Sequence, residues 1–302
     1  MYAEVLVEYT NKAVDKTFTY LVPDNLKDTI KVGMKVKIPF NNKIINGFVL
    51  KLKNNNDSDY ELKSIYKIDD ENLILNKELI SLGKHLQECT LCSKITAFQT
   101  MLPSSLKVKD QNHNYIKYVT YLVLNTNEDI VNKYIKDNTR YKAQINILND
   151  LLRDNKVLKN EYGTAPVKRL LDLGLIKEEK IQKYRLNISD NNLDQPLLLS
   201  KEQEEAVNKI DLSNHDTYLL FGTTGSGKTE VYMHLMSDVI KNNKTCLMLL
   251  PEISLTAQMI DKFYKRFGSK VAVFHSGLSQ GEKYDEYLKI YRDEIKIVVG
   301  TR

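Results

Sequence analysis

The residues with the clearest chemical potential lie in the stretch FGTTGSGKTE, residues 221–230. Two glycines separated by four residues, followed by Lys228 and Thr229, match the phosphate-binding loop (P-loop) pattern G-x-x-x-x-G-K-[ST]. Glycines let backbone N–H groups curl around the β- and γ-phosphates of a nucleotide, and the N-terminus of the following helix adds a positive dipole. Lys228 is predicted to neutralise phosphate charge and Thr229 to ligate Mg²⁺. We expect nucleotide contacts from the whole loop: Gly222, Thr223, Thr224, Gly225, Ser226, Gly227, Lys228 and Thr229.

The elements around this loop predict an α/β lobe. Apolar runs that are typical of buried strands alternate with helical patterns, and this rhythm predicts a parallel sheet covered by helices. The expected strands are TYLLF (217–221), TCLMLLP, KVAVF and IKIVVG, and the expected helices are 228–241, 254–267 and 279–291. Hydrolysis also needs a carboxylate that holds Mg²⁺ through water at the end of another strand. Glu252 is the only acid directly after a strand, so the sequence predicts half of a motor.

The first 105 residues are rich in predicted strands. AEVLVEY alternates, FTYLVP is β-branched and aromatic, and KVGMKVKIPF and IINGFVLKLK are punctuated by Gly and Pro. These runs predict a small barrel or sandwich, and from Asn76 the pattern becomes helical. Basic strands with interleaved aromatic rings are typical of single-strand binding. The residues concerned are Lys31, Lys35, Lys37, Lys43, Lys51, Lys53, Phe40 and Phe48. Alternatively, the rings are core and the lysines protect edge strands.

Residues 106–190 are predicted to be basic and mostly helical. They carry 16 Lys and Arg against 11 Asp and Glu, whereas the flanking thirds are close to neutral. One helix is predicted over 140–154 and another over 164–176, with Thr164 as its cap, Pro166 in its first turn and Gly174 at its end. The strand-like run EEKIQKYRLNI follows. This order is typical of a DNA-binding winged helix, and a well-solvated surface is the alternative explanation of the charge.

Beyond these patterns, the last third resembles the first motor lobe of superfamily-two helicases, and more narrowly the PriA family of replication-restart helicases. The matching stretches are LSKEQEEAV, GTTGSGKTEVYMHLM, LLPEISLTAQMIDKFYKRFG, VFHSGLSQGEKYDEYLKI and IVVGTR. Of these, LLPEISLTAQ followed by HSGLS-x-GE is specific to the family. The stretches EVLVEYTNKAVDKTFTYLVP and GMKVKIPFNNKIINGFVLKL look like the family's N-terminal domain. The resemblance therefore spans the whole chain.

The resemblance implies a multidomain fold. Its parts would be a β-rich OB-like barrel that binds a 3′-DNA end (1–105), a winged-helix DNA-binding domain (106–190) and a truncated first ATP-binding lobe (191–302), a partial α/β P-loop (RecA-like) helicase lobe with a parallel sheet. It further implies ATP-driven unwinding of DNA in the 3′-to-5′ direction at stalled forks and D-loops. The implied cofactors are ATP and Mg²⁺. The implied partners are forked DNA with the 3′ end of a nascent strand, primosome proteins and single-strand-binding proteins.

Site residues are carried over from the same resemblance, position by position. Gln203 is expected to recognise adenine, and Lys228 and Thr229 to serve catalysis. The PEISLTAQ and GTR loops are expected to touch the tracked DNA strand. The implied DNA-binding positions are Phe18, Thr19, Tyr20, Lys43, Gly47, Thr301 and Arg302. The family commonly has Asp where this chain has Thr19. In the alternative interpretation, Gln203 is an exposed helix residue and His275 only caps a loop.

A metal site is not predicted. His85, Cys89 and Cys92 would share one helix face and include a zinc-like C-x-x-C spacing, but no second pair of ligands follows. Zinc is expected for full-length members of the family, whose zinc cysteines lie beyond the first lobe and are absent from this chain. Three cysteines without a pairing pattern favour a reducing, cytoplasmic location. No apolar run is long enough to predict a membrane span.

Two other functions stay open at this stage. The chain can be part of another superfamily-two translocase, or a DNA-binding fragment without enzymatic activity. We expect this polypeptide alone to bind nucleotide weakly and not to unwind DNA, because the second half of the motor is not in its sequence.

Overall fold

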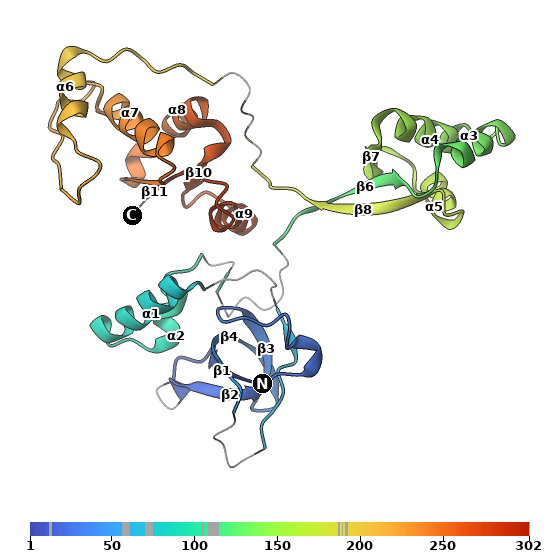
Figure 1. Cartoon of the computed structure of the whole chain (residues 1–302), viewed down its shortest axis with the longest axis horizontal. Helices are drawn as coiled ribbons and strands as arrows, with labels where there is room; N and C mark the ends of the chain where they lie inside the picture. The colour runs from blue at the N-terminus through green and yellow to red at the C-terminus, as the bar shows by residue number, and fades with distance from the viewer. Residues whose placement is uncertain are drawn as a thin grey trace. The chain divides into compact units, whose positions relative to one another are not determined.

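The computed structural model describes residues 1–11, 14–55, 61–69, 75–103, 106–107, 115–186, 188, 190 and 193–301. Its contacts divide the chain into two compact units, Met1–Tyr115 with Ile188–Arg302, and Ile116–Asn187 (Figure 1). The described residues contain two antiparallel sheets and one parallel sheet, with helices around them. The expectation of a multidomain chain with β-rich and α/β parts is confirmed at this level. No helix in these described ranges is long and apolar enough to cross a membrane.

The N-terminal strands form a five-stranded antiparallel sheet in the order β2-β1-β4-β3-β5. Its members are β1 (Tyr2–Val7), β2 (Thr17–Leu21), β3 (Lys35–Phe40), β4 (Lys43–Lys53) and β5 (Lys67–Ile68). Asn41 and Asn42 connect β3 to β4 with φ angles of 44° and 61°. Such a two-residue turn with positive φ matches the twist of the flanking strands, and asparagine tolerates it better than most residues.

This sheet curls until its edges meet. An isolated parallel bridge joins Leu21 of β2 to Ser64, which lies just before β5 in the sequence. The Tyr20 hydroxyl of β2 donates a hydrogen bond of 3.2 Å to the Pro39 carbonyl of β3. Because β2 and β3 are not neighbours in the strand order, these contacts wrap the sheet around its core. The buried residues of that core are Ala3, Val5, Val7, Tyr20, Val22, Ile30, Val36, Ile38, Ile45, Val49 and Ile65.

The helical pattern after Asn76 forms two helices, α1 (Lys77–Thr90) and α2 (Lys94–Thr100). The Asn76 side chain caps α1 by accepting a hydrogen bond from Leu79 N at 2.8 Å. Leu91, with φ 53°, ends α1 in the left-handed region and separates the two helices. Gly83 lies against the ring of Phe98, where a Cβ would come within 2.8 Å, so the glycine sets how closely the helices pack.

The unit 116–187 is built around a three-stranded antiparallel sheet in the order β7-β6-β8. Along the chain its elements are β6 (Tyr118–Leu124), α3 (Glu128–Asp137), α4 (Lys142–Asp154), β7 (Lys156–Leu158), α5 (Thr164–Asp172) and β8 (Ile176–Gln182). The predicted helices 140–154 and 164–176 correspond to α4 and to a shorter α5. The mostly helical expectation for 106–190 is incomplete, because β6 is the central strand and pairs with both others.

The ends of α5 differ in how well they follow the expected signals. Gly174, with φ 69°, lies just beyond the helix, as predicted for a glycine that ends one. The expected cap at Thr164 is wrong: the capping position is Gly163, and no side chain caps this helix. Thr164 instead occupies the first helical turn, so the N-terminus of α5 is left to backbone groups.

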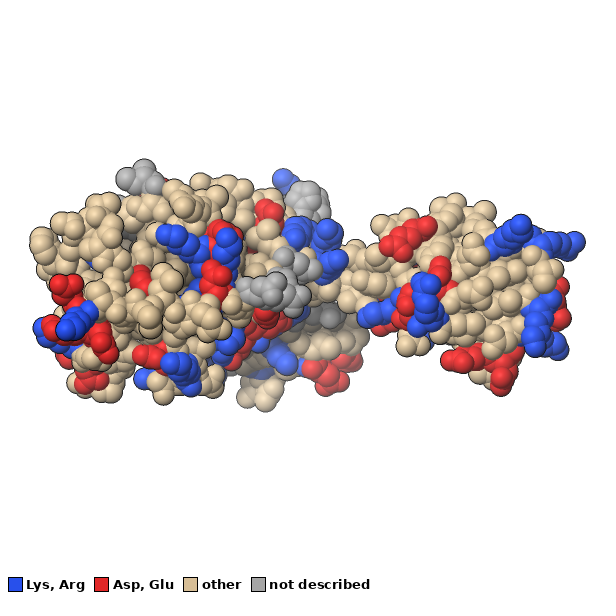
Figure 2. All heavy atoms as spheres, turned by 90° about the horizontal axis from the view of Figure 1, so that it is seen from above, with Lys and Arg blue, Asp and Glu red and all other residues tan. Residues whose placement is uncertain are grey.

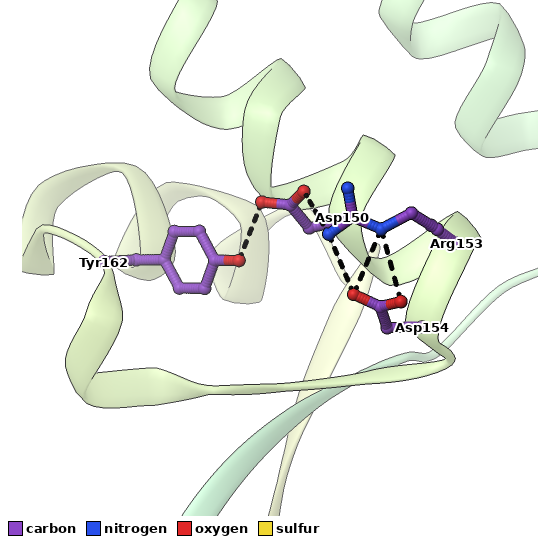
Figure 3. A network of polar contacts seen from close by, with 4 residues as sticks. All are labelled: Asp150, Arg153, Asp154 and Tyr162. Carbon is purple, nitrogen blue, oxygen red and sulfur yellow. Dashed lines mark hydrogen bonds and ion pairs between the residues drawn. The ribbon is translucent and has the colours of Figure 1, made fainter.

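A polar network fixes the segment that leads into α5 (Figure 3). The Tyr162 hydroxyl donates a 2.8 Å hydrogen bond to Asp150 Oδ2 on α4. Arg153 pairs with Asp150 at 3.2 Å and with Asp154 at 2.9 Å. Burial, followed by the hydrogen bond to Asp150, raises the pKa of Tyr162 to about 12. The network ties the chain before α5 to the last turns of α4.

The C-terminal part of the other unit contains a three-stranded parallel sheet in the order β10-β11-β9. Its elements are α6 (Lys201–Lys209), α7 (Lys228–Lys241), β9 (Cys246–Leu250), α8 (Ala257–Phe267), β10 (Val271–Phe274), α9 (Gln280–Tyr291) and β11 (Ile297–Thr301). Phe263 and Phe267 of α8 and Met233 and Met236 of α7 join the buried core of this sheet. The predicted parallel sheet with covering helices is confirmed.

One predicted strand does not form. Residues 217–221, directly before the P-loop, belong to no strand or helix. Leu219 is 90% exposed and Phe221 92% exposed. An apolar run becomes a strand only where a neighbour supplies hydrogen bonds. Within the part of the chain that the structure describes, no strand pairs with this run.

Candidate nucleotide and nucleic-acid sites

The P-loop has the backbone that its glycines predict. Gly225 and Gly227 have φ angles of 84° and 81°, and α7 begins at the next residue, Lys228. The Lys228 ammonium donates to the carbonyls of Gly222 and Thr223, both at 2.7 Å. The lysine therefore lies over its own loop, where it can exchange these two carbonyls for phosphate oxygens.

The residues of this loop fit the phosphates of a nucleoside triphosphate. A Cβ on Gly222 would lie 2.7 Å from the Ser226 hydroxyl oxygen, so the loop is too tight there for a larger residue. The N-terminus of α7 has no side-chain cap, which leaves first-turn N–H groups for an anion. Thr229 is half-buried in the same turn, the position from which a hydroxyl would ligate Mg²⁺.

Gln203 is brought to the P-loop by the way α6 begins. Ser200 caps this helix, and the Gln203 side-chain oxygen accepts a hydrogen bond of 2.9 Å from Ser200 N. The Gln203 Nε2 group donates to the Ser226 carbonyl at 3.0 Å. A Cβ on Gly227 would come within 2.2 Å of that nitrogen, so only glycine allows this approach. Gln203 thus contacts the loop as well as capping its own helix.

The two segments expected to touch DNA lie at the same edge of the parallel sheet, and the expected loop at GTR is wrong for Gly300 and Thr301, which are the last two residues of β11. Thr301, the last residue of β11, is in register with Leu250, the last residue of β9. Glu252 lies two residues beyond the end of β9, after Pro251, and is exposed. Carboxyl ends of parallel strands are where α/β sheets bind their ligands. Arg302, predicted to contact DNA, lies outside the described residues.

His275 makes the kind of contact that is expected of a residue that caps a loop. Its Nδ1 atom accepts a hydrogen bond of 3.1 Å from Gly277 N, across the turn before α9. Ser279 then caps α9 in a reciprocal arrangement with Glu282. This part of the HSG motif accordingly shapes the entry into α9.

Three aromatic rings meet at one end of the curled N-terminal sheet. The Phe18 and Phe40 rings are 5.1 Å apart at 77°, and Phe40 lies 5.6 Å from Tyr9. The Lys16 ammonium is 5.5 Å from the centre of the Phe18 ring. We call these four residues the aromatic cluster. Lys43 pairs with Phe40 across the β3–β4 turn and is exposed. Half-buried rings beside exposed cations suit stacking on unpaired bases.

The predicted DNA-binding residues of this sheet do not all share one face. Successive side chains of a strand point to opposite sides. Phe18 packs against the core and Tyr20 is buried in it. Thr19 lies between them on the other face, opposite Glu4, which pairs with Lys53.

Gly47 is buried within β4, in register with Val7 and Val36. A Cβ there would lie 2.5 Å from Val5 Cγ1 and 2.8 Å from the Leu6 carbonyl oxygen. We expect Gly47→Ala to lower the free energy of unfolding by about 1–3 kcal/mol, the usual cost of overpacking a core. Chemical denaturation of the variant measures this. Weaker DNA binding with unchanged stability would instead make Gly47 a contact residue.

The cysteine and histidine residues of α1 form a close pair. Cys89 Sγ lies 3.5 Å from His85 Nε2, and Cys89 is exposed. In the described ranges, no group of three or more His, Cys, Asp or Glu side chains is arranged to hold a metal ion.

Comparison with known proteins places both candidate sites in recognised families. Residues 4–103 match the PriA domain family described as the 3′DNA-binding domain (3′BD). Residues 197–302 match the family described as the type III restriction enzyme res subunit. The replication restart protein PriA of Bacillus subtilis is 35% identical, and the match covers 100% of this chain and 46% of the relative. The chain belongs to the PriA family.

Further PriA proteins support this assignment. Those of Chlamydia muridarum and Chlamydia trachomatis are each 32% identical over 100% of this chain and 41% of their own length. The chain therefore spans less than half the length of these PriA relatives. The aromatic cluster lies within the segment matched by the PriA 3′DNA-binding domain, and the P-loop lies within the other matched segment. Neither matched segment includes the unit 116–187.

Sequence reasoning missed part of the aromatic cluster. The sequence patterns pointed to Phe18 and Phe40, and to the neighbouring Lys43, but not to Tyr9 or Lys16. Tyr9 lies just beyond β1 and Lys16 just before β2, so neither belongs to a strand of the sheet. Tyr9 joins the cluster through Phe40 and Lys16 joins it through Phe18, and these contacts depend on the Phe18–Phe40 pair, which no local spacing predicts.

Proposed function

We propose that this chain is the DNA-end-binding and ATP-binding part of a replication-restart helicase. ATP hydrolysis in the presence of Mg²⁺ would drive 3′-to-5′ unwinding of DNA at stalled forks and D-loops. The observation that carries the proposal is the contact of Gln203 and Lys228 with one P-loop in a PriA-family chain. The 3′DNA-binding match over 4–103 adds the DNA end as a ligand.

The proposed domains are an OB-like barrel over 1–105, a winged helix over 106–190 and a RecA-like lobe over 191–302. The closed antiparallel sheet of the first part supports a barrel. In the second part, three helices on a three-stranded antiparallel sheet support a winged helix, with α5 as its exposed basic helix. The parallel sheet with a P-loop supports the third.

The proposed site roles follow the geometry. Lys228 and Thr229 would hold phosphate and Mg²⁺, with Gly222, Thr223, Thr224, Gly225, Ser226 and Gly227 as the cradle. Gln203 would recognise adenine. Phe18, Thr19, Lys43, Thr301 and Arg302 would contact DNA directly, whereas Tyr20 and Gly47 would act through the shape of the barrel, since both are buried. The partners would be forked DNA, primosome proteins and single-strand-binding proteins in the cytoplasm. Zinc would belong to parts of full-length relatives that this chain does not include.

A second candidate function is DNA binding without ATP turnover. The observation that favours it is the position of residues 217–221 outside the sheet. Among the described residues, the P-loop is then held through α7 and Gln203 and not by a strand on its N-terminal side. In this second function, such a loop would not retain a nucleotide.

Two binding measurements on the whole chain test these functions. One uses a fluorescent ATP analogue with Mg²⁺, and the other compares single-stranded DNA that ends in a 3′-hydroxyl with the same strand ending in a 3′-phosphate. We expect weak nucleotide binding and tighter binding of the free 3′ end. Preference for the 3′-hydroxyl without nucleotide binding would favour the second function. Failure of both measurements would overturn both functions.

A further inference from the structure

Surface charge does not single out a further site, because acidic and basic side chains are interspersed on the face of the molecule seen in Figure 2. A mostly buried polar cluster that begins directly after the P-loop is more distinctive. It joins Glu230 in the first turn of α7, His234 one turn later and Arg266 of α8, and all three side chains are at least three-quarters buried. Charged groups withdrawn from water need partners, so these contacts constrain the elements that carry them.

The Glu230 carboxylate ties α7 to α8. Arg266 Nη2 lies 3.5 Å from Glu230 Oε1, and His234 Nε2 lies 3.2 Å from the same oxygen. Glu230 directly follows Thr229, so its charge stands close to the loop proposed to hold phosphates. The pairing with Arg266 offsets this negative charge and turns the carboxylate toward α8.

The His234 ring also holds the segment that precedes α6. Its Nε2 atom donates a hydrogen bond of 3.1 Å to the Leu197 carbonyl. Because a carbonyl oxygen and a carboxylate oxygen both accept, the Nε2 atom of this imidazole carries a proton that is shared between them. Glu230 therefore orients the ring, and the ring fixes the backbone at Leu197.

Residues 193–199, which we call the strap, depend on polar contacts of this kind. The strap has no regular secondary structure, and Leu197 and Leu198 are 67% and 98% exposed. Little apolar burial therefore holds this stretch in place. The Asp194 N–H group donates to the Lys265 carbonyl at 2.8 Å, which gives a second anchor, on α8. The strap is thus fixed to two helices directly before α6 begins.

The strap leads to the capped start of α6, where Gln203 contacts the P-loop. The Ser200 N–H group donates to the Gln203 amide oxygen, and the Gln203 amide nitrogen donates to the Ser226 carbonyl. Beyond these contacts the amide keeps one acceptor position on its oxygen and one donor on its nitrogen. Adenine offers the complementary pair in its N6 amino group and its N7 atom. This match is available at the P-loop only while the strap keeps Gln203 there.

We propose that His234 is a positioning residue for adenine, because its hydrogen bond to the Leu197 carbonyl keeps the strap and Gln203 at the P-loop. The proposal rests on the proposed function in that Gln203 is the adenine contact. His234 lies beyond the first turn of α7 and acts through the strap. Its replacement should therefore leave the phosphate contacts of Lys228 and Thr229 in place.

The test compares the affinity of the whole chain for Mg²⁺–ATP with that for Mg²⁺–tripolyphosphate, which has the phosphates without the base. Displacement of a fluorescent ATP analogue measures both. We expect His234→Ala to lower the ATP affinity about 2- to 10-fold, the usual range for one hydrogen bond, and to leave the tripolyphosphate affinity unchanged. His234→Gln, whose amide nitrogen reaches a position similar to Nε2, should restore most of the ATP affinity. The control His215→Ala removes an exposed histidine of the same unit and should change neither affinity.

A double variant shows whether His234 acts through Gln203. If it does, adding His234→Ala to Gln203→Ala causes no further loss of ATP affinity, because the contact that His234 positions is already absent. Additive losses or an equal fall in tripolyphosphate affinity would overturn the proposal, and so would parent-like ATP binding by His234→Ala. If Gln203→Ala and Lys228→Ala still weaken ATP binding in that case, only this inference fails, and the proposed function stands. Unchanged ATP affinity in Gln203→Ala would instead overturn the proposed adenine contact, and this inference with it.

Discussion

Replacement of Lys228 by alanine is expected to lower the affinity for Mg²⁺–ATP by about 100-fold. A charge-assisted hydrogen bond is worth about 1.5–3 kcal/mol, and the upper part of this range corresponds to about two orders of magnitude in affinity. The Lys228 ammonium lies 2.7 Å from two loop carbonyls, and the bound phosphates would replace these carbonyls as its partners. No other lysine or arginine falls within the P-loop or the first turn of α7.

Lys241→Ala is the matched control for this variant. Lys241 stands at the other end of α7, exposed and paired with Asp238, so its loss removes the same charge from the same helix. Nucleotide binding should be unchanged in the control. Binding of a free 3′ DNA end should survive in both variants, because the aromatic cluster comes from the N-terminal sheet. Equal nucleotide affinity in the parent chain and in Lys228→Ala would show that the P-loop does not bind phosphate.

The P-loop and its helix could be predicted because their signals are local. Residues 228–241 were predicted as a helix and form α7 with the same bounds. The glycines before it are required by positive φ angles at Gly225 and Gly227, which a sequence pattern can specify. Residues 217–221 have an equally strong local pattern, yet they form no strand. Whether an apolar run becomes a strand depends on a neighbour far away in the sequence, and the run itself does not contain that information.

The unit 116–187 shows the opposite case, a strand that forms although the sequence did not predict it. Its helices α4 and α5 have clear periodicity, and both were predicted. The central strand β6 was not, because the basic, helix-rich composition around it masked a seven-residue apolar run, YVTYLVL. A pocket between the first turns of α4 and α5 is lined by both Arg140 and Ala165, which are 25 positions apart in the sequence. Only the packing of the two helices makes that pair adjacent.

The aromatic cluster shows most clearly that strand register decides which side chains share a face, which the sequence alone does not give. Phe18 and Thr19 are neighbours in sequence, and both were assigned to DNA binding by resemblance. In the sheet, Phe18 is in register with Val5 and Thr19 with Glu4, which lie on opposite faces. The closure of the sheet, which also joins the Tyr20 hydroxyl to the Pro39 carbonyl, brings Phe18 into contact with Phe40 of β3. The sequence could therefore name the segment, but not which of its side chains reaches the cluster.

Because Phe18 reaches the aromatic cluster and Thr19 does not, we expect the second large loss of affinity from replacement of Phe18. Phe18→Ala is expected to weaken binding of a single strand with a free 3′ end by about 10- to 100-fold. Stacking of one base on an aromatic ring is worth about 1–3 kcal/mol. Removal of this ring also ends the edge-to-face contact with Phe40 and the attraction of Lys16. Fluorescence anisotropy with a short labelled strand measures the change.

Thr19→Ala and Phe18→Tyr are the controls that give this result its meaning. Phe18→Tyr keeps the ring and should restore most of the affinity, which a loss of fold would not allow. Thr19→Ala changes the opposite face, so we expect it to reduce affinity less than Phe18→Ala does. Its effect should instead appear as a smaller difference between 3′-hydroxyl and 3′-phosphate ends if the Thr19 hydroxyl reaches the terminus. A larger loss of affinity from Thr19→Ala than from Phe18→Ala would contradict binding at the aromatic cluster. It would indicate that the DNA end binds the opposite face of the sheet, where Glu4 and Lys53 form an ion pair.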